Sequence, residues 1–251
     1  MWCRRRVGAA IVFAAAFIVF GVCLSVGPGR ADDDDARTIV FSGRDIWRNG
    51  AFAFGGLLIA PGGFEQDGFM LKLLLSGGFY RYTAGSLGGD EVIGAEWLAQ
   101  ALPGFRIKRG NAEIKIFFGP ELQKHKLWPD DPDNRLRGQT FGLRMASELW
   151  YEPTPASLIA SDASISSIAT SHSARLAYGW RVADEIFNGN GFYVGPEAQY
   201  FGSDGYRHWR LGLHITSLKT EATEWSAGGG LARDSNGYSS PYVRLSVSSR
   251  L

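Results

Sequence analysis

The stretch YRHWRLGLHITS, residues 206–217, decides the fold. Apolar side chains such as Trp209, Leu211 and Leu213 occupy its odd positions. Polar side chains such as Arg210 and His214 occupy its even positions. This period of two is typical of a β-strand with one apolar and one polar face, since a helix would need a period of 3.6. The alternation alone leaves open which face points inward.

The same alternation recurs along most of the chain. From Thr38 onward, Gly, Pro, Asn and Asp residues separate successive alternating runs, as they do between strands. The predicted strands are residues 38–47, 50–60, 69–82, 90–100, 110–123, 138–152, 156–169, 172–183, 190–202, 205–217, 222–233 and 238–250. The best helix candidate, residues 91–102, fits a strand equally well, so the sequence predicts an all-β domain of about 12 strands.

Three features favour a barrel in the outer membrane over a soluble periplasmic β-domain, which is the alternative. Many predicted strands suit a tilted bilayer crossing of about 9–11 residues. The last strand alternates up to Leu251, which resembles the C-terminal recognition strand of bacterial outer-membrane proteins. Aromatic residues gather near strand ends, as in interfacial girdles: Trp47, Phe79, Tyr80, Tyr82, Trp150, Tyr151, Phe192, Tyr193, Tyr200, Phe201, Tyr206, Trp209 and Trp225. We therefore predict an antiparallel transmembrane β-barrel with its polar face inside.

The N-terminal residues 1–31 have the layout of a secretory signal peptide. A basic start at residues 4–6 precedes an apolar run, and Gly29 and Ala31 form a small-residue cleavage site. An uncleaved membrane anchor is the alternative. Residues 32–37 are then an acidic tether, and residues 38–251 form the barrel domain.

Removal of the signal peptide would change both the cysteine content and the charge of the chain. Cys3 and Cys23 would be lost, so no disulfide is expected in the mature protein. The mature chain would carry 22 basic and 25 acidic residues, a net charge of −3. This balance gives no reason to expect nucleic-acid binding.

The polar faces carry charges of both signs on neighbouring strands. This predicts ion pairs filling a narrow lumen, or a binding site built from the same side chains. The candidate cluster consists of Glu121, Arg144, Glu148, Arg175, Arg181, Glu197, Arg210 and His214. Arg144 is the predicted partner of Glu121, and either Arg181 or Arg210 is the predicted partner of Glu197.

Both glutamates belong to a repeated Gly-Pro-Glu element at residues 119–121 and 195–197. Proline cannot donate a hydrogen bond to a strand neighbour, so a bulge in a duplicated hairpin is expected at each element. A ligand site is the alternative interpretation of the repeat.

Other kinds of site receive little support from the sequence. No catalytic residue is predicted, because the chain has no nucleophile motif such as G-x-S-x-G. No cofactor or metal is predicted either. The acidic stretch Asp130 to Asn134 lies within the long connection 123–138. Its composition is typical of turns, and this interpretation is preferred to a Ca²⁺-binding site. A channel whose cargo stacks on aromatic rings would need a row of inward aromatics. The predicted faces place few there, Phe117 and Trp150 being the clearest.

Several stretches carry a family resemblance: FSGRDIW (41–47), GGFYRY (77–82), FFGPELQKHKLWPDDPDN (117–134), SELWYEPT (147–154), YVGPEAQY (193–200) and YRHWRLGLHI (206–215). In this order they resemble the family of cellulose biosynthesis protein BcsS, over nearly the whole mature chain. The resemblance implies an exported accessory protein found with bacterial cellulose synthase operons, and it brings no established catalytic residues.

Sequence and resemblance together predict a non-catalytic outer-membrane accessory protein of cellulose or exopolysaccharide production. The expected partners are outer-membrane lipid and, as a further option, cellulose or other components of the secretion machinery. The alternatives are an outer-membrane lipid- or glycan-modifying enzyme and a soluble periplasmic domain that binds a glycan or a partner protein.

Overall fold

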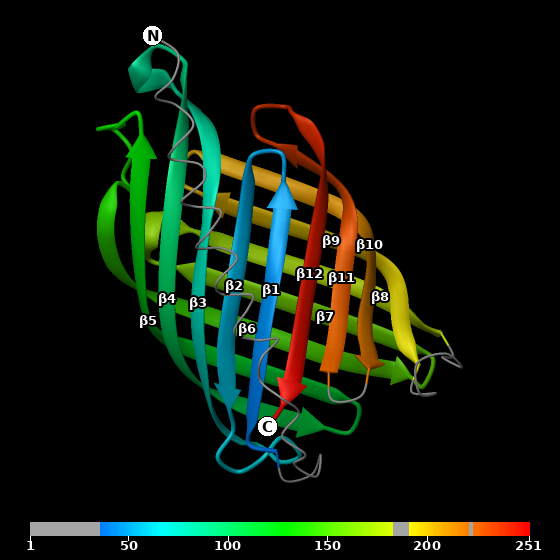
Figure 1. Ribbon diagram of the computed structural model, residues 1–251. Coiled ribbons are helices and arrows are strands. Elements are labelled where there is room, and N and C mark those ends of the chain that lie inside the picture. The colour runs from blue at the N-terminus through cyan, green and yellow to red at the C-terminus, as the bar shows by residue number, and fades with distance from the viewer. Residues whose placement is uncertain (1–35, 183–190, 221–222) are drawn as a thin grey trace.

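Twelve antiparallel strands close into a barrel in the computed structural model, which describes residues 36–182, 191–220 and 223–251 (Figure 1). Each strand pairs with its sequence neighbours, and β1 closes the barrel by pairing with β12. The strands are β1 (Thr38–Trp47), β2 (Gly50–Ile59), β3 (Gly68–Ala84), β4 (Asp90–Arg109), β5 (Ala112–Trp128), β6 (Gly138–Thr154), β7 (Ser157–Ser166), β8 (His172–Val182), β9 (Phe192–Ser203), β10 (Tyr206–Thr220), β11 (Thr223–Asp234) and β12 (Ser239–Arg250).

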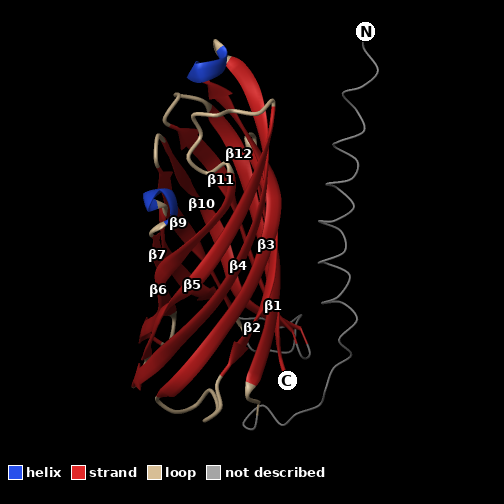
Figure 2. Cartoon of the chain, turned by 90° about the vertical axis from the view of Figure 1, so that its left-hand side faces the viewer, coloured by secondary structure: helices blue, strands red, loops and turns tan. Residues whose placement is uncertain are grey.

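The predicted all-β barrel of about 12 strands is confirmed. The two helical segments, η1 (Gly85–Leu87) and η2 (Ile168–Thr170), are short turns between strands (Figure 2). No helix in the described ranges is long and apolar enough to cross a membrane. The signal peptide predicted at residues 1–31 lies outside the described residues, as do residues 32–35 of the predicted tether.

The polar face of each strand points into the barrel. On β10 the side chain of Arg210 is 1% exposed, whereas its neighbour Leu211 is 69% exposed. The same outward exposure holds for Phe141 and Leu231 on other strands. Water would penalise so continuous an apolar outer surface, whereas lipid accommodates it. The barrel is therefore of the outer-membrane type, and the soluble periplasmic alternative is wrong.

The predicted aromatic girdles are only partly right. The strand registers place seven of the thirteen residues on the inner face: Trp47, Tyr80, Tyr82, Trp150, Tyr193, Phe201 and Tyr206. The expectation of few inward aromatics is therefore also wrong. Many of these rings lie against the barrel wall, because inner-face glycines leave room for them. A Cβ atom added to Gly94 would lie 2.4 Å from the ring of Tyr80, and one added to Gly43 would lie 2.4 Å from Phe54.

The Gly-Pro-Glu elements do not form the bulges that the sequence predicted. The β4–β5 ladder has no pairs between Gln100↔Glu121 and Gly104↔Phe117, yet it resumes without a shift in register. The β8–β9 ladder is interrupted in the same way beside Pro196. Proline lacks the N–H that a ladder pair would use. A gap in the hydrogen-bonded ladder therefore accommodates each proline, and no extra bulge residue is inserted. The glycines bring strands close: a Cβ atom on Gly195 would lie 2.0 Å from the carbonyl oxygen of Tyr178.

Candidate functional site

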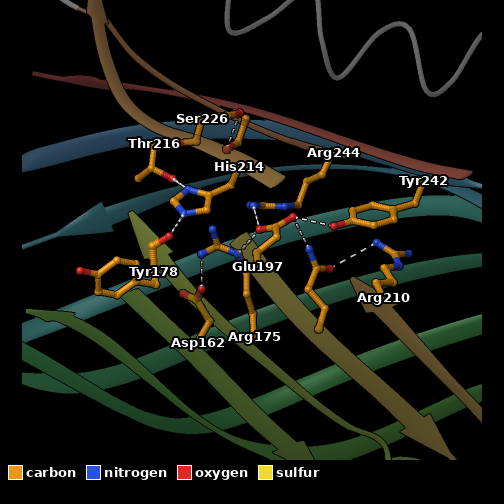
Figure 3. Close-up of polar contacts among 12 residues, drawn as sticks. Asp162, Arg175, Tyr178, Glu197, Arg210, His214, Thr216, Ser226, Tyr242 and Arg244 are labelled. Atoms are coloured by element: carbon orange, nitrogen blue, oxygen red, sulfur yellow. Dashed lines mark hydrogen bonds and ion pairs between the residues drawn. The ribbon is translucent and has the colours of Figure 1, made fainter. Parts of the chain in front are cut away.

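A buried carboxylate, that of Glu197 on β9, is the centre of a polar group inside the barrel (Figure 3). It accepts hydrogen bonds from Arg175 Nε at 2.8 Å and from Arg244 Nη2 at 2.9 Å. The Tyr242 hydroxyl donates to it at 2.9 Å, and the Gln199 amide donates at 2.8 Å. The group therefore joins β8, β9 and β12, and two guanidinium groups share one carboxylate.

Glycines on the intervening strands let β9 and β12 meet in this way. One row of paired residues runs from Glu197 through Gly212 and Gly230 to Tyr242. A Cβ atom at Gly212 would lie 2.5 Å from the Tyr242 hydroxyl oxygen. A Cβ atom at Gly228 would lie 2.3 Å from Glu197 Oε1. The glycine-rich part of β11 is therefore the surface over which these side chains make contact.

Glu121 on β5 repeats part of this arrangement. Its carboxylate, 1% exposed for the whole residue, is bound by Arg144, by the Ser166 hydroxyl at 2.6 Å and by the Gln100 amide at 2.7 Å. Gln123, two residues further along the same strand, donates to it at 2.9 Å. Gln199 has the same place relative to Glu197, so the duplicated element is Gly-Pro-Glu-x-Gln.

The predicted partners of these glutamates are half correct. The pair Glu121–Arg144 is present. The prediction that Arg181 or Arg210 neutralises Glu197 is wrong, because Arg181 lies level with Tyr193 on the neighbouring strand. Arg210 lies opposite Gln199 and binds Asp45 at 2.8 Å.

The partners that the sequence missed, Arg244 and Tyr242, lie three strands away from β9 along the sheet. These two side chains reach the Glu197 carboxylate because Gly212 and Gly228 on the intervening strands carry no side chain that would block them. The Gly228–Gly230 run was the signal in the sequence that could have indicated this approach.

Three polar contacts reach past two intervening strands and brace the interior. Arg244 on β12 binds Glu197 on β9. Lys72 on β3 binds Glu148 on β6 at 2.5 Å, and Lys115 adds a contact to Glu148 at 3.4 Å. Asp45 on β1 binds Arg210 on β10. The guanidinium carbon of Arg210 also lies 4.7–5.0 Å from the ring centres of Trp47, Phe201 and Tyr242.

Near the end of the barrel at which β1 begins and β12 ends, the interior is apolar. Leu58, Ala60, Phe64, Met70, Leu102 and Phe117 form one buried cluster contributed by β2–β5 and the β2–β3 connection. Phe64 belongs to that connection and is 7% exposed. This cluster fills space that an open channel would leave to water.

The histidine contacts in the described part of the chain include no serine hydroxyl. His214 contacts the Thr216 hydroxyl at 2.8 Å and the backbone oxygen of Tyr178 at 3.1 Å. His125 contacts Tyr80 and Gln123, and His172 contacts Tyr200 and a backbone oxygen. A serine nucleophile would need a histidine within hydrogen-bonding distance, and no such pair occurs among these contacts.

The long connection is shorter than predicted, because β5 continues to Trp128 and the loop spans residues 129–137. It lies at the end of the barrel opposite the start of β1 and the end of β12. In it, Asp131 is 4% exposed and accepts hydrogen bonds at 2.7 Å from the hydroxyls of Tyr82 and Ser86. Asn134 also binds the Tyr82 hydroxyl. The acidic stretch therefore ties this loop to β3 and the following turn.

The hydroxyls of Tyr82 and Ser86 hold the pKa of Asp131 below its ordinary value of 3.8. A carboxylate with a lowered pKa stabilises the folded loop above the unfolded pKa, and the contribution is lost as the pH falls through the folded value. We expect Asp131→Asn to loosen the loop at neutral pH, seen as faster trypsin cleavage after Arg135 and Arg137. The control is Asp133→Asn, which should be cleaved at the wild-type rate. Equal rates for both variants would contradict this anchoring role.

The comparisons with known proteins agree with this architecture. A family model described as cellulose biosynthesis protein BcsS matches residues 39–251. No curated protein matches the chain. An outer membrane channel from Pseudomonas putida F1 is similar in structure at 12% identity, with a TM-score of 0.54 over 90% of this chain and 100% of that one. The β-domain of the Bordetella autotransporter BrkA gives a TM-score of 0.54 at 12% identity, over 86% of this chain and 100% of that one. These two likenesses show the fold alone.

Proposed function

The chain belongs to the cellulose biosynthesis protein BcsS family, and from that premise we propose that it is a non-catalytic outer-membrane accessory protein whose braced barrel does not itself conduct the glucan. The observation that carries this proposal is the Glu197 group, which connects β9 to β12 through the interior. The contacts Lys72–Glu148 and Asp45–Arg210 add two further braces.

Energetics supports this interpretation. Separating a buried ion pair costs roughly 3–5 kcal/mol when one partner is left without compensation. A polysaccharide threading the barrel would have to displace several such pairs together with the apolar cluster around Phe117. The inner aromatic rings do not present a free row for sugar stacking either, because many pack on glycines or on one another. Trp150, for example, lies against Tyr193 with ring centres 6.0 Å apart.

The candidate cluster predicted from the sequence is, in this proposal, structural. Glu121, Arg144, Glu148, Arg175, Glu197 and Arg210 act by holding strands together. An outer-membrane enzyme remains the alternative function. His172 would be its best base, because the other histidines are more deeply buried.

Genetic complementation tests the non-catalytic role. In a strain lacking this gene, His172→Ala should restore cellulose to the level of the wild-type copy, measured as glucose released by cellulase and normalised to barrel abundance. Glu197→Gln should restore cellulose in proportion to the amount of folded barrel. A His172→Ala protein of normal abundance that restores no cellulose would favour the enzyme instead.

A further inference from the structure

Basic and aromatic side chains share the lipid-facing surface of β3, β4 and β5, near the end of the barrel that carries the loop 129–137. On β5, Lys124 and Lys126 are exposed and alternate with the buried Gln123 and His125. They follow an outward apolar series that includes Ile114, Ile116, Phe118 and Leu122. Lysine is costly at the centre of a barrel's lipid face and tolerated near its interface. The two lysines therefore mark one boundary of the apolar band.

The strand registers place aromatic partners around these lysines. Lys124 lies beside Trp97, and Lys126 lies beside Ala95, which is only 8% exposed although it faces outward. The next row contains Arg81, Ile93 and Trp128. Lys126 Nζ lies 5.1 Å from the centre of the Trp128 ring. Cations and indole rings therefore surround the covered position Ala95.

Of the three cations on this surface, Arg81 has an acidic neighbour. Glu91 is 3.8 Å from Arg81, and both side chains are largely exposed. No ion pair joins Lys124 or Lys126 to a carboxylate in the described ranges. Two phosphate-binding cations beside interfacial tryptophans suit an anionic lipid headgroup better than a neutral one.

The two ends of the barrel differ in the number of cations on the outer face. The outward-facing cations nearer this end of their strands are Arg44, Arg81, Lys124, Lys126, Arg207 and Arg233. At the opposite end, Arg109 is the outward-facing cation on the described strands, and Asp67 binds it at 2.6 Å. A phosphate-rich leaflet is therefore expected at the end that carries the loop 129–137. This places the end of the barrel at which β1 begins and β12 ends on the periplasmic side.

We propose that the surface formed by Arg81, Trp97, Lys124, Lys126 and Trp128 binds the phosphate groups of the glycolipid in the outer leaflet. The lysines would contact the phosphates through charge-assisted hydrogen bonds, and the tryptophans would lie at headgroup level against the acyl boundary. The proposal uses only lipid-facing positions, so it does not depend on whether the lumen conducts.

Native mass spectrometry of the detergent-purified mature protein with diphosphoryl lipid A tests this site. We expect Lys124→Gln/Lys126→Gln to weaken binding by about tenfold or more, because each basic residue contributes to holding an anionic headgroup. Lys124→Arg/Lys126→Arg should bind as the wild type does, and monophosphoryl lipid A should bind more weakly than the diphosphoryl form. Raising the salt concentration should also weaken wild-type binding.

The matched control is Arg135→Gln/Arg137→Gln, which removes the same charge from the loop at the same end. This variant should bind diphosphoryl lipid A as the wild type does. Unchanged binding by the lysine-to-glutamine variant would overturn the proposal, as would an equal loss in the loop control. Heat-dependent migration in SDS gels shows whether each variant is folded before it is compared.

Discussion

Replacing Glu197 by glutamine is expected to lower the free energy of unfolding by about 3–5 kcal/mol. The carboxylate is fully buried and lies between the guanidinium groups of Arg175 and Arg244. A neutral amide would leave both cations without their shared counter-charge, and it would place a donor where Tyr242 and Gln199 now donate. The temperature at which the barrel unfolds in detergent, read from its migration in SDS gels, measures this loss.

Glu121→Gln should have a smaller effect, because one arginine rather than two depends on that carboxylate. The exposed control Glu91→Gln should change the unfolding free energy by no more than about 0.5 kcal/mol. In a double-mutant cycle, Arg244→Gln should cost less in the Glu197→Gln background than alone. A Glu197→Gln barrel that unfolds at the wild-type temperature would contradict the bracing role. If that variant also kept its abundance but produced no cellulose, a ligand site at Glu197 would be the better account.

Replacing Leu211 by arginine should prevent most of the protein from assembling in the outer membrane. Leu211 faces lipid and is 69% exposed on β10. An arginine near the midplane of a barrel's lipid face costs roughly 2–4 kcal/mol, which is a large part of the stability of a typical domain. The folded fraction in isolated outer membranes, seen by heat-dependent migration, is the quantity to compare.

Leu211→Phe is the matched control, because it changes the size of the side chain and keeps it apolar. It should assemble normally. Arg210→Leu would be a poor control, since it removes the partner of Asp45 and is costly for a different reason. Normal assembly of Leu211→Arg would show that this face of β10 does not meet lipid.

Alternation in the sequence predicted the strands and their inner and outer faces, because each face meets a different solvent along the whole strand. Glu121–Arg144 could be predicted for a related reason, since the two residues lie on adjacent strands. Prediction failed where this pattern carries no information. The stretch QKHKLW, residues 123–128, continues β5 although most of its residues are polar. There the strand extends beyond the apolar band, and both faces meet polar surroundings.

Aromatic residues were misassigned because their type does not indicate a face. Tyr80 and Tyr82 point inward, whereas Phe79 between them shares its face with Ala95. The partners of Glu197 depend on contacts between strands that are not neighbours, and such contacts depend on the absence of side chains at Gly212, Gly228 and Gly230. A list of polar residues could not reveal them. The number of glycines, 33 in the chain, was visible, but the role of each required the register.

Conductance of the refolded barrel in a planar bilayer tests the central claim most directly. A barrel braced by Glu197–Arg244, Lys72–Glu148 and Asp45–Arg210 should show no large steady current steps. An open porin measured in the same bilayer provides the reference for a wide lumen. Steady steps of porin size from the wild-type barrel would contradict the braced interior and would reopen the possibility that the barrel conducts the glucan.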